Sequence, residues 1–138
     1  MESIKKLNNY AHWTLRIALA SVFIYHGVTK FPVLSGMAEM MGLPVVILFL
    51  VAVAGTVGGA LIPLGGFLKD WITHLGSLMF VPVLLGAIFM VHWGQWNNFV
   101  QTESHPMGGM EFQVTILLIS LYLFVKGCSV NSSEAVKV

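Results

Sequence analysis

The residues best suited to chemistry in this chain are ionisable side chains that interrupt long apolar runs. His26 and Lys30 lie four residues apart, so on a helix they would share one face. Arg16 precedes them in the same run, His92 ends a later run, and Glu111 begins the last one. If these runs cross a membrane, a charge at the centre costs about 2.5–3.5 kcal/mol on insertion scales. Each of these residues is therefore a candidate for ligand binding or proton transfer.

A second group of side chains could bind a soft metal ion, because thioether and imidazole ligands suit Cu(I). The candidate ligands are methionines and histidines near the predicted loops: Met37, Met40, Met41, His92, His105, Met107 and Met110. The alternative is that the methionines fill irregular gaps where loops pack onto a helix bundle. A haem with His26 and His92 as axial ligands also stays open.

The composition of the chain identifies lipid as its solvent. Of 138 residues, 57% are hydrophobic and 9% are charged, whereas soluble domains have about 45–50% and about 25%. A soluble domain of this size leaves about 30% of its chain surface in water, so a soluble enzyme is excluded. Seven Lys and Arg against six Asp and Glu make no basic surface for nucleic acid. The single cysteine, Cys128, excludes a disulfide within one chain.

The apolar runs predict an all-α fold, a single domain formed by a bundle of four transmembrane helices. A helix needs about 20 residues to cross a hydrocarbon core of about 30 Å. The predicted spans are approximately residues 11–31, 44–66, 72–92 and 110–127, followed by a short polar tail at 128–138. Residues 32–43 and 93–110 are the predicted loops on one side. Gly55 and Gly59 predict close helix packing, since small residues let helices approach in lipid.

Basic residues near the ends of the spans predict the orientation. Five lysines share one side of the predicted bundle: Lys5, Lys6, Lys69, Lys126 and Lys137. Only Lys30 lies on the other side, so the excess of basic residues places both termini in the cytoplasm.

This topology brings four ionisable groups to one depth in the outer leaflet: His26, Lys30, His92 and Glu111. We predict that Lys30 and Glu111 form an ion pair there, with His92 adjacent. If the group binds a ligand head group or relays a proton, Trp93 is predicted to stack nearby. Arg16 lies in the inner half of its span and is predicted to make an interior contact. The alternative interpretation is that the outer charges pair only for structure.

Several short motifs follow one another in an order that resembles a known family. They are Arg16-Ile-Ala-Leu-Ala-Ser-Val-Phe23-Ile-Tyr-His26-Gly27-Val-Thr-Lys30, Gly58-Gly59-Ala-Leu-Ile-Pro-Leu-Gly65 followed by Lys69, His92, and Gly109-Met-Glu111-Phe112. Over residues 11–127 the chain resembles the DoxX family of membrane proteins. Family members often carry a glutamate shortly before the paired glycines, whereas residues 54–57 contain no acid here. Any proton or quinol role of that glutamate is therefore absent or relocated in this chain.

The resemblance implies a multi-pass protein of the bacterial cytoplasmic (inner) membrane. Some family members are subunits of thiosulfate:quinone oxidoreductase, and others are linked to redox stress or to maturation pathways. The leading interpretation is a subunit that supports a redox process, not catalytic alone, with a quinone or another lipophilic ligand at the outer polar group. The alternatives are a non-enzymatic anchor or assembly factor for a partner protein, and copper handling. The expected partners are the lipid bilayer and a protein partner or a second copy of the chain, with no nucleic acid.

Overall fold

The computed structural model describes residues 10–127, and within this range the protein is helical and contains no strand. Five α-helices follow one another: α2 (Ala11–Val28), α3 (Leu34–Met41), α4 (Val45–Phe67), α5 (Asp70–Ala87) and α6 (Glu111–Lys126). A 3-10 turn, η2 (Phe31–Val33), joins α2 to α3, and a π-helical turn, η3 (Ile88–His92), extends α5. The all-helical prediction is confirmed.

Among residues 10–127, three helical segments are long and apolar enough to cross a membrane: Ala11–Met41, Val45–Phe67 and Asp70–His92. Helix α6 has 16 residues, which is about 24 Å at 1.5 Å per residue. It is the short fourth helix that the sequence predicted, and it depends most on its flanking residues to match the thickness of a bilayer.

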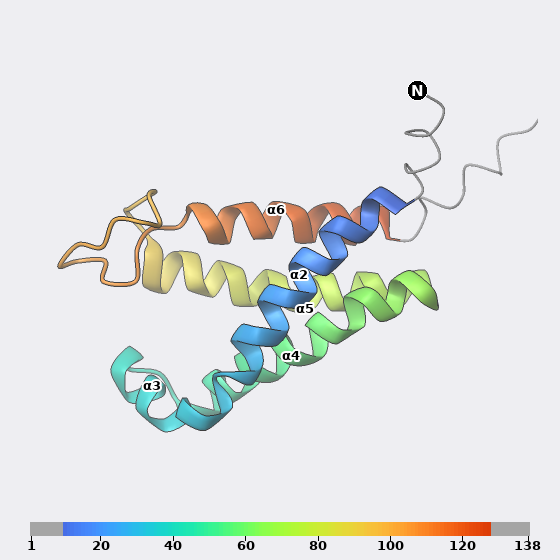
Figure 1. Ribbon diagram of the computed structural model, residues 1–138. Coiled ribbons are helices and arrows are strands. Elements are labelled where there is room, and N and C mark those ends of the chain that lie inside the picture. Colours follow the sequence, from blue (N-terminus) through green and yellow to red (C-terminus); the bar gives the residue numbers. More distant parts are fainter. Residues whose placement is uncertain (1–9, 128–138) are drawn as a thin grey trace, which may run out of the picture.

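The helices form a bundle with two distinct ends (Figure 1). Helix α2 packs against α4, α4 against α5, and α5 against α6. The start of α2, the end of α6 and the turn between α4 and α5 lie at one end, which we call the terminal end. Helix α3 and the loop at residues 93–110 lie at the opposite end, which we call the loop end. The predicted arrangement, with both described chain ends on one side, is therefore present.

Glycines allow the close crossing of these helices. A Cβ atom added to Gly58 of α4 would lie 2.7 Å from Phe80 Cε1 and 3.2 Å from the backbone oxygen of Gly76 in α5. A Cβ atom added to Gly55 would lie 3.2 Å from the backbone oxygen of Phe23 in α2. The packing role predicted for the glycines of the second span is confirmed at both faces of α4.

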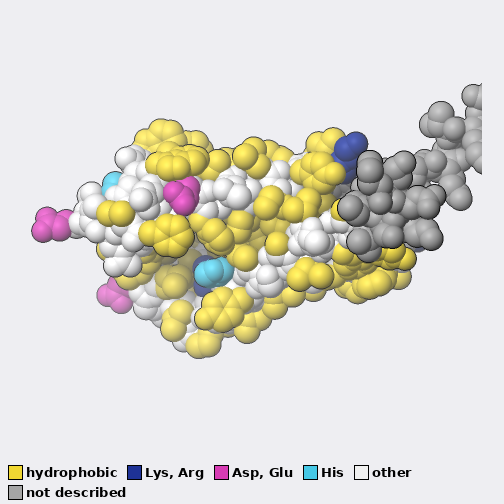
Figure 2. Space-filling view, turned by 45° about the horizontal axis from the view of Figure 1, so that its top comes forward, with side chains coloured by type: hydrophobic (Ala, Val, Ile, Leu, Met, Phe, Trp, Pro, Cys, Tyr) yellow, Lys and Arg dark blue, Asp and Glu magenta, His cyan; other side chains and the backbone are white. Residues whose placement is uncertain are grey.

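The core is small, and much apolar surface stays outside it. Phe23 of α2 stacks on Phe80 of α5 with ring centroids 3.5 Å apart, and both side chains are buried. Many large hydrophobic side chains are exposed on the outer surface of the bundle, as the hydrophobic areas of Figure 2 show. A surface of this kind is expected where lipid replaces water as the solvent.

The segment at residues 32–43 differs from the prediction, because it folds into η2 and α3 instead of forming an irregular loop. Gly42 ends α3 in the left-handed region with a φ of +63°, and the Leu43 amide donates to the backbone oxygen of Ala38 over 2.9 Å. This is the hydrogen-bonding pattern of a glycine-terminated helix. Ala38 is buried, and α3 packs against α4. A short helix therefore packs against α4 at the loop end of the bundle.

The orientation of the bundle in the membrane stays a prediction, since Lys5, Lys6, Lys137 and Cys128 lie outside the described residues. The predicted orientation, with both termini in the cytoplasm, implies that Ser104→Cys, in a Cys128→Ser background, reacts with a membrane-impermeant maleimide in intact cells. Ser104 is exposed in the loop at residues 93–110. The matched control is Lys69→Cys at the terminal end, which should react only after lysis. The reverse pattern of labelling would overturn the predicted orientation.

Candidate functional site

A cavity of about 760 Å³ opens at the loop end of the bundle, and all five helices contribute to its wall. Most of the wall is apolar, with Phe23, Leu48, Val51, Leu84 and Ile116 among the lining side chains. In Figure 2, a recess among hydrophobic side chains at this end contains histidine and basic side-chain atoms. An apolar cavity of this volume is typical of small-molecule sites.

Five polar side chains line this cavity: His26, Lys30, His92, Asn98 and Gln113. The structure thus brings together three of the six residues that the sequence proposed for a ligand site. Arg16, Trp93 and Glu111 do not line the cavity.

His26 and Lys30 occupy the end of α2 and the residues just after it, one helical turn apart. The Lys30 ammonium group donates to the backbone oxygen of His26 over 2.9 Å. This bond uses one of the three N–H donors of the ammonium group. Lys30 therefore presents a positive charge and further donors at the cavity wall.

The predicted ion pair between Lys30 and Glu111 is not formed, so this prediction is wrong. Within residues 10–127 the ammonium group of Lys30 has no carboxylate partner. Glu111 is half-buried at the first turn of α6, and its backbone amide donates to the oxygen of Trp96 over 3.0 Å. A carboxylate at this position is already favoured by the positive end of the helix dipole, so it needs no lysine.

His92 is held by hydrogen bonds on both ring nitrogens. Its Nδ1 atom lies 2.9 Å from the backbone oxygen of Gly108, and its Nε2 atom lies 2.8 Å from Nε2 of Gln113. A carbonyl oxygen only accepts, so Nδ1 carries the proton and, in the neutral ring, Nε2 accepts from the Gln113 amide. The π-helical turn η3 carries this buried histidine to the end of its helix. Such turns occur often at functional sites.

The backbone conformation of Gly108 directs its carbonyl oxygen toward His92. Its φ is +79°, in the left-handed region, and an added Cβ atom would collide with the backbone oxygen of Asn98. Glycine is the residue that adopts this conformation without steric cost. The His-Pro-Met-Gly-Gly-Met segment at residues 105–110 therefore positions a carbonyl group for His92, which composition alone does not reveal.

Gln113 and Asn98 are the cavity residues that the sequence reasoning missed. The carboxamide nitrogen of Gln113 donates a hydrogen bond to His92, and its oxygen is buried with no hydrogen-bond partner. Both side chains are neutral amides, and a neutral amide in an apolar run is less conspicuous than an ionisable group. The signal that could have found Gln113 is its place within the first turn of the last apolar run, two residues after Glu111.

Arg16 lies at the terminal end and belongs to a different network. Its side chain is fully buried and donates to His12 Nδ1 over 3.0 Å and to Thr73 Oγ1 over 2.8 Å. It also donates to the backbone oxygens of Ile62, over 2.6 Å, and Gly127, over 3.0 Å. These partners belong to α2, α5, α4 and the residue after α6, so one guanidinium group joins α2, α4 and α5 to the end of α6. The predicted interior contact of Arg16 is confirmed.

Trp93 lies at the loop end but outside the cavity. Its side chain is 59% exposed, and its ring centroid lies 5.0 Å from that of Phe89 in η3. It therefore lies beside the site without forming part of its wall.

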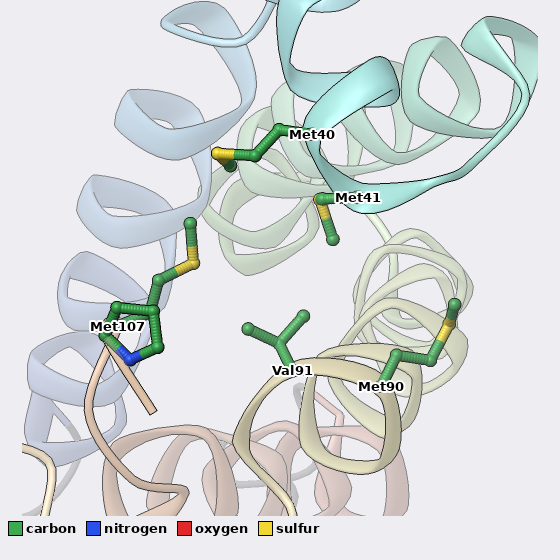
Figure 3. A pocket seen from close by; sticks show the side chains of 6 residues that line it. Met40, Met41, Met90, Val91 and Met107 are labelled. Atoms are coloured by element: carbon green, nitrogen blue, oxygen red, sulfur yellow. The ribbon is translucent and has the colours of Figure 1, made fainter. Parts of the chain in front are cut away.

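A second pocket of about 310 Å³ adjoins the cavity and is lined mainly by methionines. Figure 3 shows Met40 and Met41 of α3, Met90 of η3 and Met107 of the loop around it. Met41, Met90, Val91 and Met107 line both spaces, so the pocket and the cavity share a wall.

The structure gathers only part of the proposed copper ligands. Met40, Met41 and Met107 line the methionine pocket, whereas Met37 lines the cavity and Met110 lines neither space. Both proposed histidines are already engaged. His105 bonds to Ser104 Oγ through Nδ1 over 3.0 Å, and its Nε2 lies 2.7 Å from the backbone oxygen of Trp93. Among residues 10–127 no three His, Cys, Asp or Glu side chains form a metal-binding group. Copper binding stays a prediction.

Haem ligation through His26 and His92 would have to break an existing contact. An axial histidine needs a free ring nitrogen, whereas both nitrogens of His92 are hydrogen-bonded. His92 therefore has no ring nitrogen free to bind iron in this structure, and haem binding stays a prediction.

Comparisons with known proteins agree with the helical membrane fold. A Bacillus subtilis (strain 168) protein named "Putative oxidoreductase CatD" is 28% identical over 116 residues, which are 82% of this chain and 76% of that protein. No solved structure matches the chain. The DoxX family model matches residues 11–93, which include His26, Lys30 and His92 of the cavity wall. Because this match covers more than half of the chain, the protein belongs to the DoxX family of membrane proteins.

Proposed function

We propose that this protein binds a lipophilic quinone-type ligand in the cavity at the loop end and serves as the membrane subunit of a redox system. The observation that carries the proposal is the composition of the cavity wall: about 760 Å³ enclosed by apolar side chains, with Lys30, His92 and Gln113 at its polar part. An apolar ring with an isoprenoid or alkyl tail matches such walls, and its oxygen atoms match the polar groups.

The side chains have distinct roles in this proposal. Lys30 binds a ligand oxygen with the N–H donors that it does not give to His26. His92, fixed by Gly108, keeps Gln113 in one orientation, so the polar part of the wall stays ordered. A bound quinone supplies reversible uptake of electrons and protons. The surrounding apolar side chains exclude water from it.

The name of the Bacillus subtilis relative supports a redox role. The protein that exchanges electrons with the bound ligand is proposed to be a separate chain. We place the protein in the bacterial cytoplasmic membrane, with the ligand entering from the outer leaflet. The methionine pocket next to the cavity suits such entry, because methionine side chains are flexible and apolar.

A second candidate function is that of a membrane anchor or assembly factor. It is favoured by the loop at residues 93–110, where the side chains of Trp96 and Phe99 are 57% and 86% exposed. Backbone hydrogen bonds from Gly109 to Asn97 and from Met110 to Gln95 hold this loop in one conformation. An ordered loop with exposed aromatic side chains could contact a partner protein or the membrane interface.

A cavity-filling variant separates the two candidates. Gly86 lines the cavity, and a Cβ atom added there meets no atom within 4 Å. The Cβ position is therefore open, and we expect the ring of Gly86→Phe to occupy part of the cavity and to weaken binding of a short-chain quinone at least tenfold, or about 1.4 kcal/mol. Quenching of tryptophan fluorescence in lipid nanodiscs, with a decyl-substituted benzoquinone as probe, would measure the affinity.

The matched control is Gly36→Phe. Gly36 also has open space around its Cβ position, but it lies on α3 and does not line the cavity. Quinone affinity should be the same in this variant as in the unmodified protein. Absence of quinone binding to the unmodified protein, or equal binding in both variants, would refute the proposed function and favour the anchor.

A further inference from the structure

Lys30 is a cation in an apolar cavity whose wall contains no acidic side chain. Of the described residues that line the cavity, none is Asp or Glu. We infer that the cavity selects a ligand whose head-group oxygen is negatively charged, with Lys30 as its counter-ion. This inference rests on the proposed function and deepens it, because it specifies the charge of the bound ligand.

The charged and titratable groups around the cavity come from few elements. Helix α2 and the residues after it supply His26 and Lys30, and η3 supplies His92. The lining residues of α3, α4, α5 and α6 include no titratable side chain. Two acids are on the helices nearby, Glu39 on α3 and Glu111 on α6, but neither lines the cavity. A formal negative charge beside Lys30 must therefore come from a group other than the residues that line the cavity.

The hydrogen bonds of the site leave Lys30 available for an anion. One N–H donates to the oxygen of His26, and two donors of the ammonium group remain. A backbone oxygen carries no formal charge, so this bond does not neutralise the lysine. Interactions between charges strengthen where apolar walls replace water. An oxyanion therefore gains more from Lys30 than a neutral carbonyl oxygen does.

Two other polar side chains of the wall, His92 and Gln113, do not favour an oxyanion. His92 in its neutral form presents no charge, since Nδ1 donates to Gly108 and Nε2 faces the amide of Gln113. The buried oxygen of Gln113 is itself an acceptor and would repel an anion. The negatively charged oxygen is therefore placed at Lys30, and the opposite part of the head group faces Gln113.

Two kinds of lipophilic molecule share this chemistry: the deprotonated hydroquinone or phenol, and the ionised fatty acid. A probe that reports its own ionisation distinguishes a charged from a neutral bound form. A 4-nitrophenol with an alkyl chain is suitable, because its phenolate absorbs visible light and its phenol does not. Its methyl ether differs from it by one methyl group and cannot ionise.

The experiment measures the pKa of the bound nitrophenol in nanodiscs of neutral lipid. With the unmodified protein, we expect the probe pKa to fall by about one unit relative to empty nanodiscs, which is a tenfold preference for the phenolate. Lys30→Met should abolish the shift, and Lys30→Arg should retain it. Lys69→Met is the matched control, since Lys69 is an exposed lysine at the terminal end, and it should leave the shift unchanged.

The methyl ether shows whether a variant is still folded and able to bind. We expect it to bind equally to the unmodified protein and to Lys30→Met. Binding of both probes with the same nitrophenol pKa in Lys30→Met and in the unmodified protein would overturn the inference, while leaving the proposed cavity intact. Binding of neither probe to any form would overturn the proposed function itself.

Competition identifies the source of the oxyanion. Displacement of the probe by a hydroquinone analogue, with a loss of affinity in Lys30→Met, supports both proposals. Displacement only by a fatty acid of equal chain length supports the role of Lys30 and overturns the quinone assignment.

Discussion

Arg16→Leu should lower the free energy of unfolding by about 2–4 kcal/mol. The arginine is fully buried and donates to four acceptors on α2, α4, α5 and the residue after α6. Leucine leaves those acceptors without these donors, and a buried polar group that loses its partner costs about 1–3 kcal/mol. Measured hydrogen bonds in a membrane protein average nearer 0.6 kcal/mol, which keeps the expected total below the simple sum. Reversible unfolding in mixed detergent micelles, followed by circular dichroism, would measure it.

Two further variants separate the hydrogen bonds of Arg16 from its charge and from general effects of mutation in α2. Arg16→Lys keeps the positive charge but has a single donor group, so an intermediate loss is expected. Ile17→Ala changes the neighbouring residue, whose side chain is 63% exposed, and should cost less than about 0.5 kcal/mol. Equal stability of Arg16→Leu and Ile17→Ala would show that the network does not hold the helices together.

Gly27→Ala should destabilise the protein by about 1–3 kcal/mol, the usual cost of overpacking. The added Cβ atom would lie 2.5 Å from the backbone nitrogen of Thr56 and 2.9 Å from the backbone oxygen of Ala52, both in α4. Backbone atoms of a packed helix cannot rotate away as a side chain can, so α2 and α4 must separate. Because Gly27 also lines the cavity, quinone affinity should fall together with the melting temperature.

Gly36→Ala gives the opposite expectation and is the control. Gly36 is a helical residue of α3 with no atom within 4 Å of its Cβ position. In an exposed helix alanine is favoured over glycine by up to about 1 kcal/mol, so the melting temperature should stay the same or rise. A loss of stability at both glycines would attribute the effect at Gly27 to something other than the crossing of α2 and α4.

Much of the architecture could be predicted from the sequence, because hydropathy and helix length act locally. The 57% of hydrophobic residues identify lipid as solvent, and backbone groups in lipid must bond within helices. The glycines of α4 predict close crossings for the same local reason, the absence of a side chain. Residues 34–41 were predicted as part of a loop, yet they form α3, because packing of Ala38 on α4 stabilises a helix too short to be stable alone.

The candidate site could be predicted only in part, and its residues show why. The depth of His26, Lys30 and His92 follows from their positions along apolar runs, since each helical residue advances 1.5 Å, and these three do line one cavity. The position of Gln113 in the cavity wall and the separation of Lys30 from Glu111 depend instead on how each helix is rotated about its axis.

That rotation is decided by tertiary contacts. They are the close contact of Gly27 with Thr56, the stacking of Phe23 on Phe80, and the hydrogen bond between His92 and the backbone oxygen of Gly108. The sequence by itself thus determined the solvent, the helical class and the depth of the polar groups, because each depends on a residue and its near neighbours. Only the tertiary structure decided which of those groups face each other, because helix rotation and crossing depend on contacts between residues far apart in the chain.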